Sequence, residues 1–258
     1  MKLIRSLPAS TLQSISQALK AGRLKPPYTA FTVAEWVPQS SRHLLAAELV
    51  SLETCGFTTT TLAITLEALA EDAAARQRVI DQIQLVWTSP DEEGPHVRDT
   101  SVVVRQLLSE ARKSLWISTY SVFNGQEVFL PIEEAWSFRP QLEVVLILNV
   151  PPNEDAAVEK YAWSFWKYHW PWTRKPAVFY DPRGPEKTSG APACQHAKCI
   201  LVDGVTAFIT SANFTESAHE RNIELGVLFR ENPKVAQSIR SKFASLIQNQ
   251  YLKPLPTV

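Results

Sequence analysis

The chain has 258 residues, 45% of them hydrophobic, and its 26 Lys and Arg residues balance 26 Asp and Glu residues. This composition is typical of a globular protein and excludes a disordered, collagen-like or low-complexity chain. No apolar run approaches the roughly 18–20 residues of a membrane-spanning helix, so we expect a cytoplasmic protein with no stable membrane association. Because the net charge is zero, any phosphate binding must depend on local cations. The three cysteines (Cys55, Cys194 and Cys199) are odd in number and are not spaced as in disulfide-rich proteins, so we expect no disulfide.

Residues 1–84 are predicted to form a helical region of their own. Pro8 precedes one amphipathic stretch, Gly56 ends a second, and a threonine cluster at 58–61 caps a third. These helices carry no catalytic pattern, so a packing, partner-docking or substrate-framing role stays open. The expected helices are Ser10–Ala21, Ser40–Cys55, Leu62–Glu71 and Ala74–Ile83.

From residue 84 onward, short β-branched or aromatic runs alternate with helical stretches, which is typical of α/β organisation. Residues 85–258 are therefore expected to form one α/β domain, in which Asp99 or Thr100 caps the first helix. The expected strands are Gln84–Thr88, Ser114–Ser121, Glu143–Val150, Ala177–Tyr180, Gln195–Val202, Thr206–Thr210 and Glu224–Phe229. The expected helices are Ser101–Arg112, Gln126–Ser137, Glu154–Tyr168, Thr215–His219 and Lys234–Gln248.

Four polar residues are expected to meet at one end of a hairpin that turns at Asp203-Gly204. Residues two apart on a strand share a face, so His196 and Lys198 should project together. Ser211 and Asn213 follow the next strand with the same parity. An imidazole, an ammonium, a hydroxyl and a carboxamide together suit a phosphodiester, because they offer a nucleophilic or acid–base group, a cation and neutral donors.

This segment resembles the HKD motif of the phospholipase D superfamily. Thr210 stands where that family usually has glycine, a difference that removes no chemical group. The resemblance implies an α-β-α sandwich with a mixed sheet, a catalytic domain with one HKD motif, and a mainly structural role for the motif's aspartate. The matching residues are His196-x-Lys198-x4-Asp203, Thr-Ser-x-Asn at 210–213, and Asn222-x-Glu224.

The family's residue roles, carried over to the matching positions, imply the chemistry of the site. His196 would be the nucleophile that forms a phosphohistidine. Lys198 and Asn213 would hold phosphate oxygens, while Ser211 and Glu224 would support the site, Glu224 by orienting a histidine. The resemblance implies no cofactor and no metal, since imidazoles and cations take the place of a Lewis acid.

The family's active site needs two facing histidines, but this chain has one such motif and no internal repeat. The resemblance therefore implies a two-fold homodimer with both copies of His196 at its axis, an isologous contact.

The whole chain also resembles the phospholipase D-like proteins of the DISARM anti-phage defence system, notably at Arg98–Arg105, Tyr180–Arg183 and Ser211–Glu216. This implies a phosphodiesterase that acts as a DNA nuclease in bacterial anti-phage defence, with other defence-system proteins as partners. Two alternatives stay open: a non-catalytic nucleic-acid-binding or scaffold subunit of a defence complex, and a lipid phosphodiesterase.

Two other interpretations concern histidines and cysteines. The four histidines outside the motif are taken as structural core residues. A metal cluster that includes Cys194 and His196 is disfavoured, because closed zinc sites prefer Cys-x2-Cys pairs. Cys199 should face away from His196 and is interpreted as a small buried apolar residue. The four histidines are His43, His96, His169 and His219. The disfavoured metal cluster would consist of Cys194, His196, Cys199 and His219.

Half of the eight tryptophans fall between residues 163 and 172, interleaved with cations. These rings could stack the bases of a single strand. We favour the other interpretation, in which Trp163, Phe165 and Trp166 bury one side of a helix. The expected substrate contacts are then the cations Arg174, Lys175, Arg183 and Lys187.

Overall fold

The computed structural model describes residues 1–89, 98–151, 157–183, 194–215, 218 and 222–257 of the chain. The chain forms two compact units, Met1–Asp81 and Gln82–Val258. The sequence pattern placed the boundary after residue 84, which lies inside the first strand of the second unit. Among the described residues, none of the helices combines the length and the apolar character needed to cross a membrane.

The first unit is a set of helices around its own apolar core, which includes Leu12, Ile15, Leu45 and Leu49. The two helices expected at 62–71 and 74–83 are one continuous helix, because the alanine-rich segment 73–75 favours helix and contains no breaker. The elements are the 3-10 turn η1 (Ile4–Ser6), α1 (Ala9–Lys20), α2 (Gln39–Thr54) and α3 (Thr59–Asp81).

The second unit is built on a nine-stranded mixed sheet in the order β2-β1-β8-β7-β6-β3-β4-β5-β9. Strands β3, β4 and β5 are parallel to one another. On the other side of β3, each successive pair is antiparallel: β3 with β6, β6 with β7, β7 with β8, and β8 with β1. The strands are β1 (Ile83–Thr88), β2 (Arg98–Asp99), β3 (Ser114–Thr119), β4 (Glu143–Leu148), β5 (Ala177–Tyr180), β6 (Cys199–Val202), β7 (Thr206–Thr210), β8 (Glu224–Phe229) and β9 (Lys253–Pro254).

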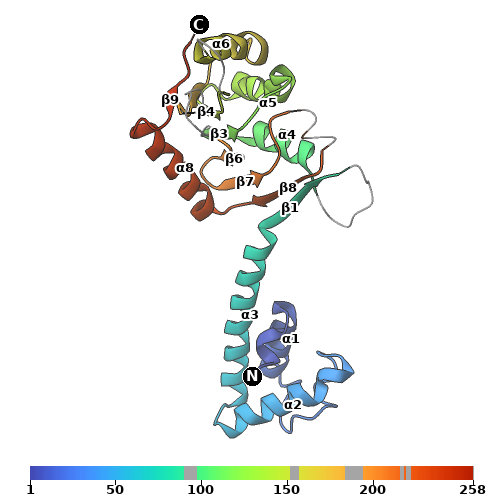
Figure 1. Ribbon diagram of the computed structural model, residues 1–258. Helices are drawn as coiled ribbons and strands as arrows, with labels where there is room; N and C mark the ends of the chain where they lie inside the picture. The colour runs from blue at the N-terminus through green and yellow to red at the C-terminus, as the bar shows by residue number, and fades with distance from the viewer. Residues whose placement is uncertain (90–97, 152–156, 184–193, 216–217, 219–221, 258) are drawn as a thin grey trace. The chain divides into compact units, whose positions relative to one another are not determined.

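Helices cover both faces of this sheet (Figure 1). All six residues of β3 are buried, as expected for a strand between two helical layers. Ile117 and Phe208 pack with Phe129 of α5 on one face, while Trp116 and Leu201 pack with Ala236 of α8 on the other. The unit is therefore the expected α-β-α sandwich. The helices are α4 (Thr100–Glu110), α5 (Gly125–Phe138), α6 (Ala157–Ser164), which continues into the π-helical turn η2 (Phe165–His169), and α8 (Pro233–Gln248).

Two local differences from the expected elements bear on the site. The strand expected from Gln195 begins only at Cys199, so residues 195–198 precede β6 instead of belonging to it. The short helix expected at Thr215–His219 lies largely outside the described residues. Asp99 caps α4 as expected, because its carboxylate accepts hydrogen bonds from the backbone N–H groups of Ser101 and Val102.

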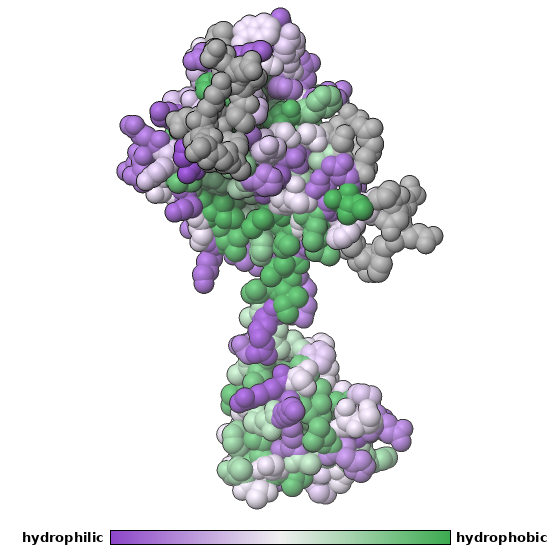
Figure 2. Space-filling model, viewed as in Figure 1, coloured by the Kyte–Doolittle hydropathy of each residue, from purple (hydrophilic) through white to green (hydrophobic). Residues whose placement is uncertain are grey.

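One part of the sheet stays uncovered by the described helices of its unit. On the α8 face, β1, β7 and β8 expose a row of apolar side chains, and Figure 2 shows hydrophobic residues gathered on this part of the unit. Contiguous exposed apolar surface of this kind is uncommon on isolated soluble domains. The residues are Ile83, Leu85, Trp87, Ile209 and Leu225.

Candidate functional site

The candidate site lies at the sheet edge where the parallel strands β3, β4 and β5 end. Parallel strands have their carboxyl ends at one edge, which is where α/β sheets commonly bind ligands. Because β6 is antiparallel to β3 and pairs Cys199 with Ser118, the residues just before β6 reach the same edge. Ser211 directly follows β7, and Glu224 begins β8, so these two residues lie there as well.

His196 and Lys198 lie side by side as expected, although the strand on which that expectation rested begins only at Cys199. The Lys198 ammonium nitrogen is 3.3 Å from Nδ1 and 3.5 Å from Nε2 of His196, and it donates a 3.0 Å hydrogen bond to the His196 carbonyl. The His196 side chain is exposed and Lys198 is partly buried. An accessible imidazole beside a fixed cation is suited to a negatively charged substrate.

The charge of Lys198 is subject to opposing influences. Burial lowers the pKa of Lys198, while the nearby Glu224 carboxylate and Cys194 act in the opposite direction. Glu224 therefore helps to keep this ammonium group protonated.

Ser211 and Glu224 form a second polar group next to this pair. The Ser211 hydroxyl donates to Oε2 of Glu224 and accepts a 3.1 Å hydrogen bond from the backbone N–H of Leu225. The Asn222 amide donates to the other carboxylate oxygen, Oε1, at 3.1 Å. Glu224 is thus held by Ser211 and Asn222, and no hydrogen bond joins it to His196 in the described structure.

Asn213 differs from these residues in having an unsatisfied side chain. Its Oδ1 atom is buried and forms no hydrogen bond with the part of the chain that the structure describes. The loop around it is nevertheless anchored, because the backbone N–H of Phe214 donates to Thr119 Oγ1 at 3.1 Å and that of Ala212 to Thr210 Oγ1 at 3.0 Å. A buried unpaired acceptor is unfavourable, so a bound group that supplies a donor would stabilise this position.

Asp203 lies at the other end of β6 from Lys198. Its carboxylate accepts hydrogen bonds from the backbone N–H groups of Arg112 (3.1 Å), Lys113 (2.7 Å) and Ser114 (2.9 Å), which connect α4 to β3. The structure therefore does not bring Asp203 together with the other motif residues. Its contacts fit the mainly structural role that the resemblance implies.

Three residues that sequence reasoning did not assign to the site directly follow the parallel strands: Tyr120 after β3, Asn149 after β4 and Asp181 after β5. The Tyr120 ring lies 5.0 Å from the His196 ring between centroids. A polar or aromatic residue at the first position after each buried strand was the available signal for all three.

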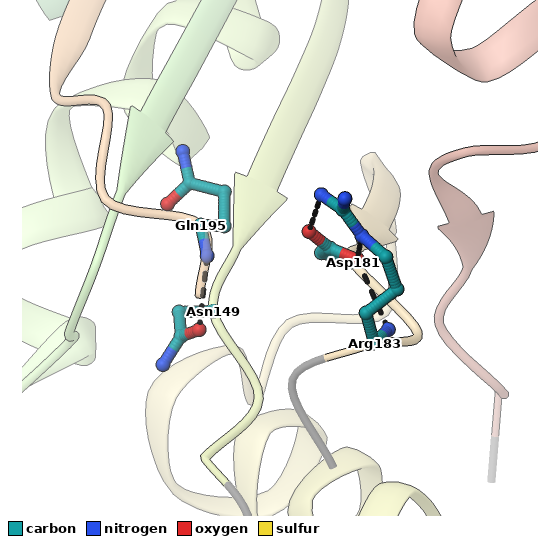
Figure 3. A network of polar contacts seen from close by, with 4 residues as sticks. All are labelled: Asn149, Asp181, Arg183 and Gln195. Atoms are coloured by element: carbon teal, nitrogen blue, oxygen red, sulfur yellow. Dashed lines mark hydrogen bonds and ion pairs between the residues drawn. The ribbon is translucent and has the colours of Figure 1, made fainter. Parts of the chain in front are cut away.

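Gln195 holds the segment that carries His196. Its backbone N–H donates to Oδ1 of Asn149 at 3.2 Å (Figure 3). Its buried side-chain amide donates to the Ser118 hydroxyl and, at 2.8 Å, to the Ala197 carbonyl. These side-chain contacts fix residues 195–197 where the regular β6 ladder is absent.

Of the three expected substrate-contacting cations that the structure describes, Arg183 is held at this edge. Its guanidinium donates to both carboxylate oxygens of Asp181, at 3.0 and 2.7 Å (Figure 3). Asp181 is only 5% exposed, and the hydrogen bonds from Arg183 hold the pKa of this carboxyl below its ordinary value.

The other expected cations are placed differently. The Arg174 guanidinium lies over the Trp136 ring, 4.2 Å from its centroid, and donates to the Pro140 carbonyl at 2.8 Å. The Lys175 ammonium lies 4.8 Å from the centroid of the Trp166 ring. Lys187 lies outside the described residues.

The tryptophan-rich segment is mainly structural, as favoured from the sequence. Phe165, Trp166 and Trp170 are buried in the core between the sheet and its helices. Trp163 is an exception to the expectation, because it is 45% exposed and its ring lies 4.4 Å from the Lys167 ammonium.

The remaining histidines and cysteines lie as follows. His169 is partly buried and accepts a 3.3 Å hydrogen bond from the Gly125 N–H, in line with a structural role, whereas His43 is exposed. Cys199 is buried on the α8 face, as predicted for a small apolar residue, and burial raises the pKa of its thiol to about 12. The described residues contain no group of three or more His, Cys, Asp or Glu side chains that could hold a metal ion. His96 and His219 lie outside those residues.

Comparisons with known proteins give a consistent set of similarities. Residues 104–247 match the family model described as cardiolipin synthase, PLD-like domain. The DISARM protein DrmC of Bacillus paralicheniformis is 25% identical over 183 residues, which are 69% of this chain and 69% of that protein.

Three similar solved structures each match about two thirds of the chain. Nuc from Salmonella typhimurium, a phospholipase D family member, has a TM-score of 0.43 and 22% identity, over 67% of this chain and 96% of that chain. NucT from Helicobacter pylori has a TM-score of 0.45 and 17% identity, over 64% and 96%. Phosphatidylserine synthase from Haemophilus influenzae has a TM-score of 0.46 and 15% identity, over 65% and 39%.

Proposed function

The chain belongs to the family of PLD-like domains that includes cardiolipin synthase, within the PLD-like phosphodiesterase superfamily, and on this basis we propose that it is a metal-independent DNA nuclease of bacterial anti-phage defence. The observation that carries the proposal is the pair of His196 and Lys198, which lie 3.3 Å apart with the imidazole exposed at the sheet edge. The defence context is supported by the similarity to the DISARM protein DrmC.

In the proposed reaction, a ring nitrogen of His196 attacks the phosphorus of a DNA phosphodiester. The bond from phosphorus to the leaving oxygen breaks, and that oxygen takes a proton from the partner's His196. A water molecule then attacks the phosphohistidine and loses a proton to the same partner imidazole, while the bond from phosphorus to nitrogen breaks. The products are a free hydroxyl and a phosphomonoester, and both histidines return to their initial state.

The remaining site residues would stabilise charge on the phosphate. Lys198 supplies a cation, and the Asn213 amide supplies a neutral donor whose own buried oxygen lacks a partner within the described chain. Glu224, held by Ser211 and Asn222, would favour the protonated form of Lys198 against the effect of burial. Asp203 would affect this site only indirectly, by stabilising the start of β3.

We also propose that the active protein is a homodimer. The described chain presents one His196 at the site, and the exposure of its imidazole leaves it accessible to a second copy. A two-fold axis at this position would bring the two imidazoles to opposite sides of one phosphorus.

Arg183 is proposed as the leading contact to a neighbouring phosphate. The buried Asp181 fixes its guanidinium at the sheet edge that carries the site, and a guanidinium has five N–H donors, more than the carboxylate of Asp181 uses. Arg183→Gln is expected to weaken DNA binding and to lower its salt dependence. Arg174→Gln is the matched control, because Arg174 packs on Trp136 and should affect stability more than binding.

The primary test incubates wild type, His196→Ala and His43→Ala with labelled single- and double-stranded DNA in excess EDTA. Cleavage by wild type and His43→Ala, with none by His196→Ala, supports the proposal, because His43 is an exposed histidine of the other unit. Cleavage that persists in His196→Ala would contradict it. If no protein cleaves DNA and His196→Ala still supports phage protection, the chain acts instead as a binding or scaffold subunit.

A further inference from the structure

We propose that Tyr120 and Phe123 form a stacking subsite for an unpaired nucleobase, so that the site acts on single-stranded DNA. This inference rests on the proposed nuclease function and names its substrate class. Both residues lie in the connection from β3 to α5, at the edge that carries His196.

Tyr120 stands directly beside the reactive pair. Its ring centroid lies 5.0 Å from that of His196, with the planes tilted by 59°, and 5.9 Å from the Lys198 ammonium. The ring is 37% exposed, and its hydroxyl has no hydrogen-bond partner among the described residues. A phosphodiester that contacts His196 and Lys198 must therefore place one of its substituents close to this ring.

Phe123 is exposed on a segment that is held firmly in place. Its side chain is 60% exposed and belongs to none of the hydrophobic cores formed by the described residues. Its backbone N–H donates a 3.0 Å hydrogen bond to the carbonyl of Phe214, the residue after Asn213. Val122 pairs with Phe214 in a β-bridge, which fixes the segment against the loop that carries Asn213.

This combination of exposure and fixed backbone suits base stacking. Tyr120 is an exposed ring beside the phosphate-binding pair, and Phe123 is an exposed ring three residues further along the same connection. A base that stacked on these rings would remove their apolar surface from water, which is favourable. Proteins that bind single strands pair cations that track the backbone with aromatic rings that stack bases. Here Lys198 and Arg183 supply the cations, and Tyr120 and Phe123 supply the rings.

The substrate class follows from the same geometry. Bases in a duplex are stacked on each other and cannot lie on a protein ring unless they are extruded. A lipid phosphodiester carries no planar group next to its phosphate that would use such a ring. The site therefore favours a strand whose bases are already unpaired.

The test compares cleavage of an oligothymidylate with cleavage of an abasic oligomer of the same length, which has the same phosphates but no bases. Wild type is expected to prefer the base-containing oligomer in kcat/KM by about tenfold or more. Tyr120→Leu and Phe123→Leu should reduce this preference toward one, by slowing cleavage of the oligothymidylate while the rate on the abasic oligomer stays similar.

Two controls separate stacking from a purely structural role. Tyr120→Phe keeps the ring and should keep the preference, because the hydroxyl it removes has no partner among the described residues. If Tyr120 served only to position His196, Tyr120→Leu would slow the cleavage of both oligomers equally. An unchanged preference in both leucine variants would overturn the proposal.

A binding measurement distinguishes failure of the subsite from failure of the nuclease. In the His196→Ala background, an oligomer with 2-aminopurine should lose fluorescence on binding, and Tyr120→Leu should restore most of it. If wild type cleaves nothing but this quenching is seen, the nuclease proposal fails and the subsite stands. If wild type cleaves DNA and no quenching is seen, the subsite fails alone.

Discussion

Lys198 shows how a single residue in this site depends on its surroundings. Burial lowers its pKa from the ordinary value of 10.5, and the charge of Glu224 opposes that change. A cation with a lowered pKa loses its proton at a lower pH than a free lysine. The affinity of the site for anions should therefore depend on pH in a range where other lysines stay charged.

We expect DNA binding by His196→Ala to weaken as the pH rises through the lowered pKa of Lys198, because only the protonated form attracts phosphate. Adding Glu224→Gln removes the opposing charge, which lowers the pKa of Lys198 further and moves this loss of binding to lower pH. Fluorescence anisotropy of a labelled oligonucleotide between pH 7 and about pH 10 measures both curves. Adding Lys198→Arg instead should remove the pH dependence, and an unchanged curve in that variant would rule out Lys198 as its source.

Asp203 has a different kind of importance, because its carboxylate satisfies three backbone N–H groups at the start of β3. Asp203→Ala should lower the free energy of unfolding by about 1–3 kcal/mol, because it leaves these donors without their acceptor. The backbone at this position also has φ of 54°, which alanine tolerates poorly. Urea unfolding followed by tryptophan fluorescence measures the change.

Glu143→Ala is the matched control in the same unit. Glu143 is exposed, and its Oε2 atom lies 3.9 Å from Nη2 of Arg240. Loss of this exposed ion pair should change the unfolding free energy by less than about 0.5 kcal/mol. Asp203→Asn, which keeps one acceptor oxygen and tolerates positive φ, should fall between the two. Equal stabilities of all three variants would contradict the structural role.

At the scale of elements, α5 depends on a close approach to the π-helical turn η2. A Cβ added at Gly125 would lie 2.5 Å from the Cβ of His169, so the two backbones could not keep their present distance. Gly125→Ala should therefore destabilise the protein by about 1–3 kcal/mol, as measured by thermal unfolding. Ser137→Ala, an exposed change on the same helix, should stay within about 0.5 kcal/mol.

Several elements could be predicted from the sequence because their signals are local. Strands β5, β7 and β8 have the predicted bounds, since short β-branched or aromatic runs end at turn residues on both sides. The segment before β6 also has a strand-like pattern, but Gln195 is held there by side-chain contacts to Asn149 and Ser118. Those partners lie far away in the sequence, so its pattern could not reveal them.

The candidate site was predictable to the extent that its residues form one motif. His196 and Lys198 are two residues apart and lie together as expected, although the strand whose parity led to that expectation begins only after them, at Cys199. Tyr120, Asn149 and Asp181 come from three other strands, and they meet the motif only through the order of strands in the sheet. The order of strands cannot be read from the local patterns of one sequence, so these residues were identified only in the structure.

At the scale of the whole molecule, the proposed dimer makes a quantitative prediction. If each active centre needs one His196 from each copy, a co-refolded equal mixture of wild type and His196→Ala should retain about one quarter of the wild-type rate per total protein. Copies that act independently would retain about half. Cleavage assays across a series of mixing ratios distinguish a quadratic from a linear dependence.

The same mixing series with His43→Ala in place of His196→Ala should leave the rate unchanged, which controls for losses during refolding. Light scattering over the same concentrations gives an independent result. A protein that is strictly monomeric at micromolar concentration and nevertheless cleaves DNA would disprove the shared active centre.

The strand order also has a consequence for the protein as it is synthesised. The early strands β3, β4 and β5 can pair with one another as they emerge, but β3 keeps an open edge until β6 arrives beside it. Because β6 directly follows His196 and Lys198, the step that closes the sheet is also the step that brings these residues to Tyr120. A nascent chain therefore lacks the assembled site until its central pairing is complete, and truncation before Cys199 would leave an exposed strand edge prone to aggregation.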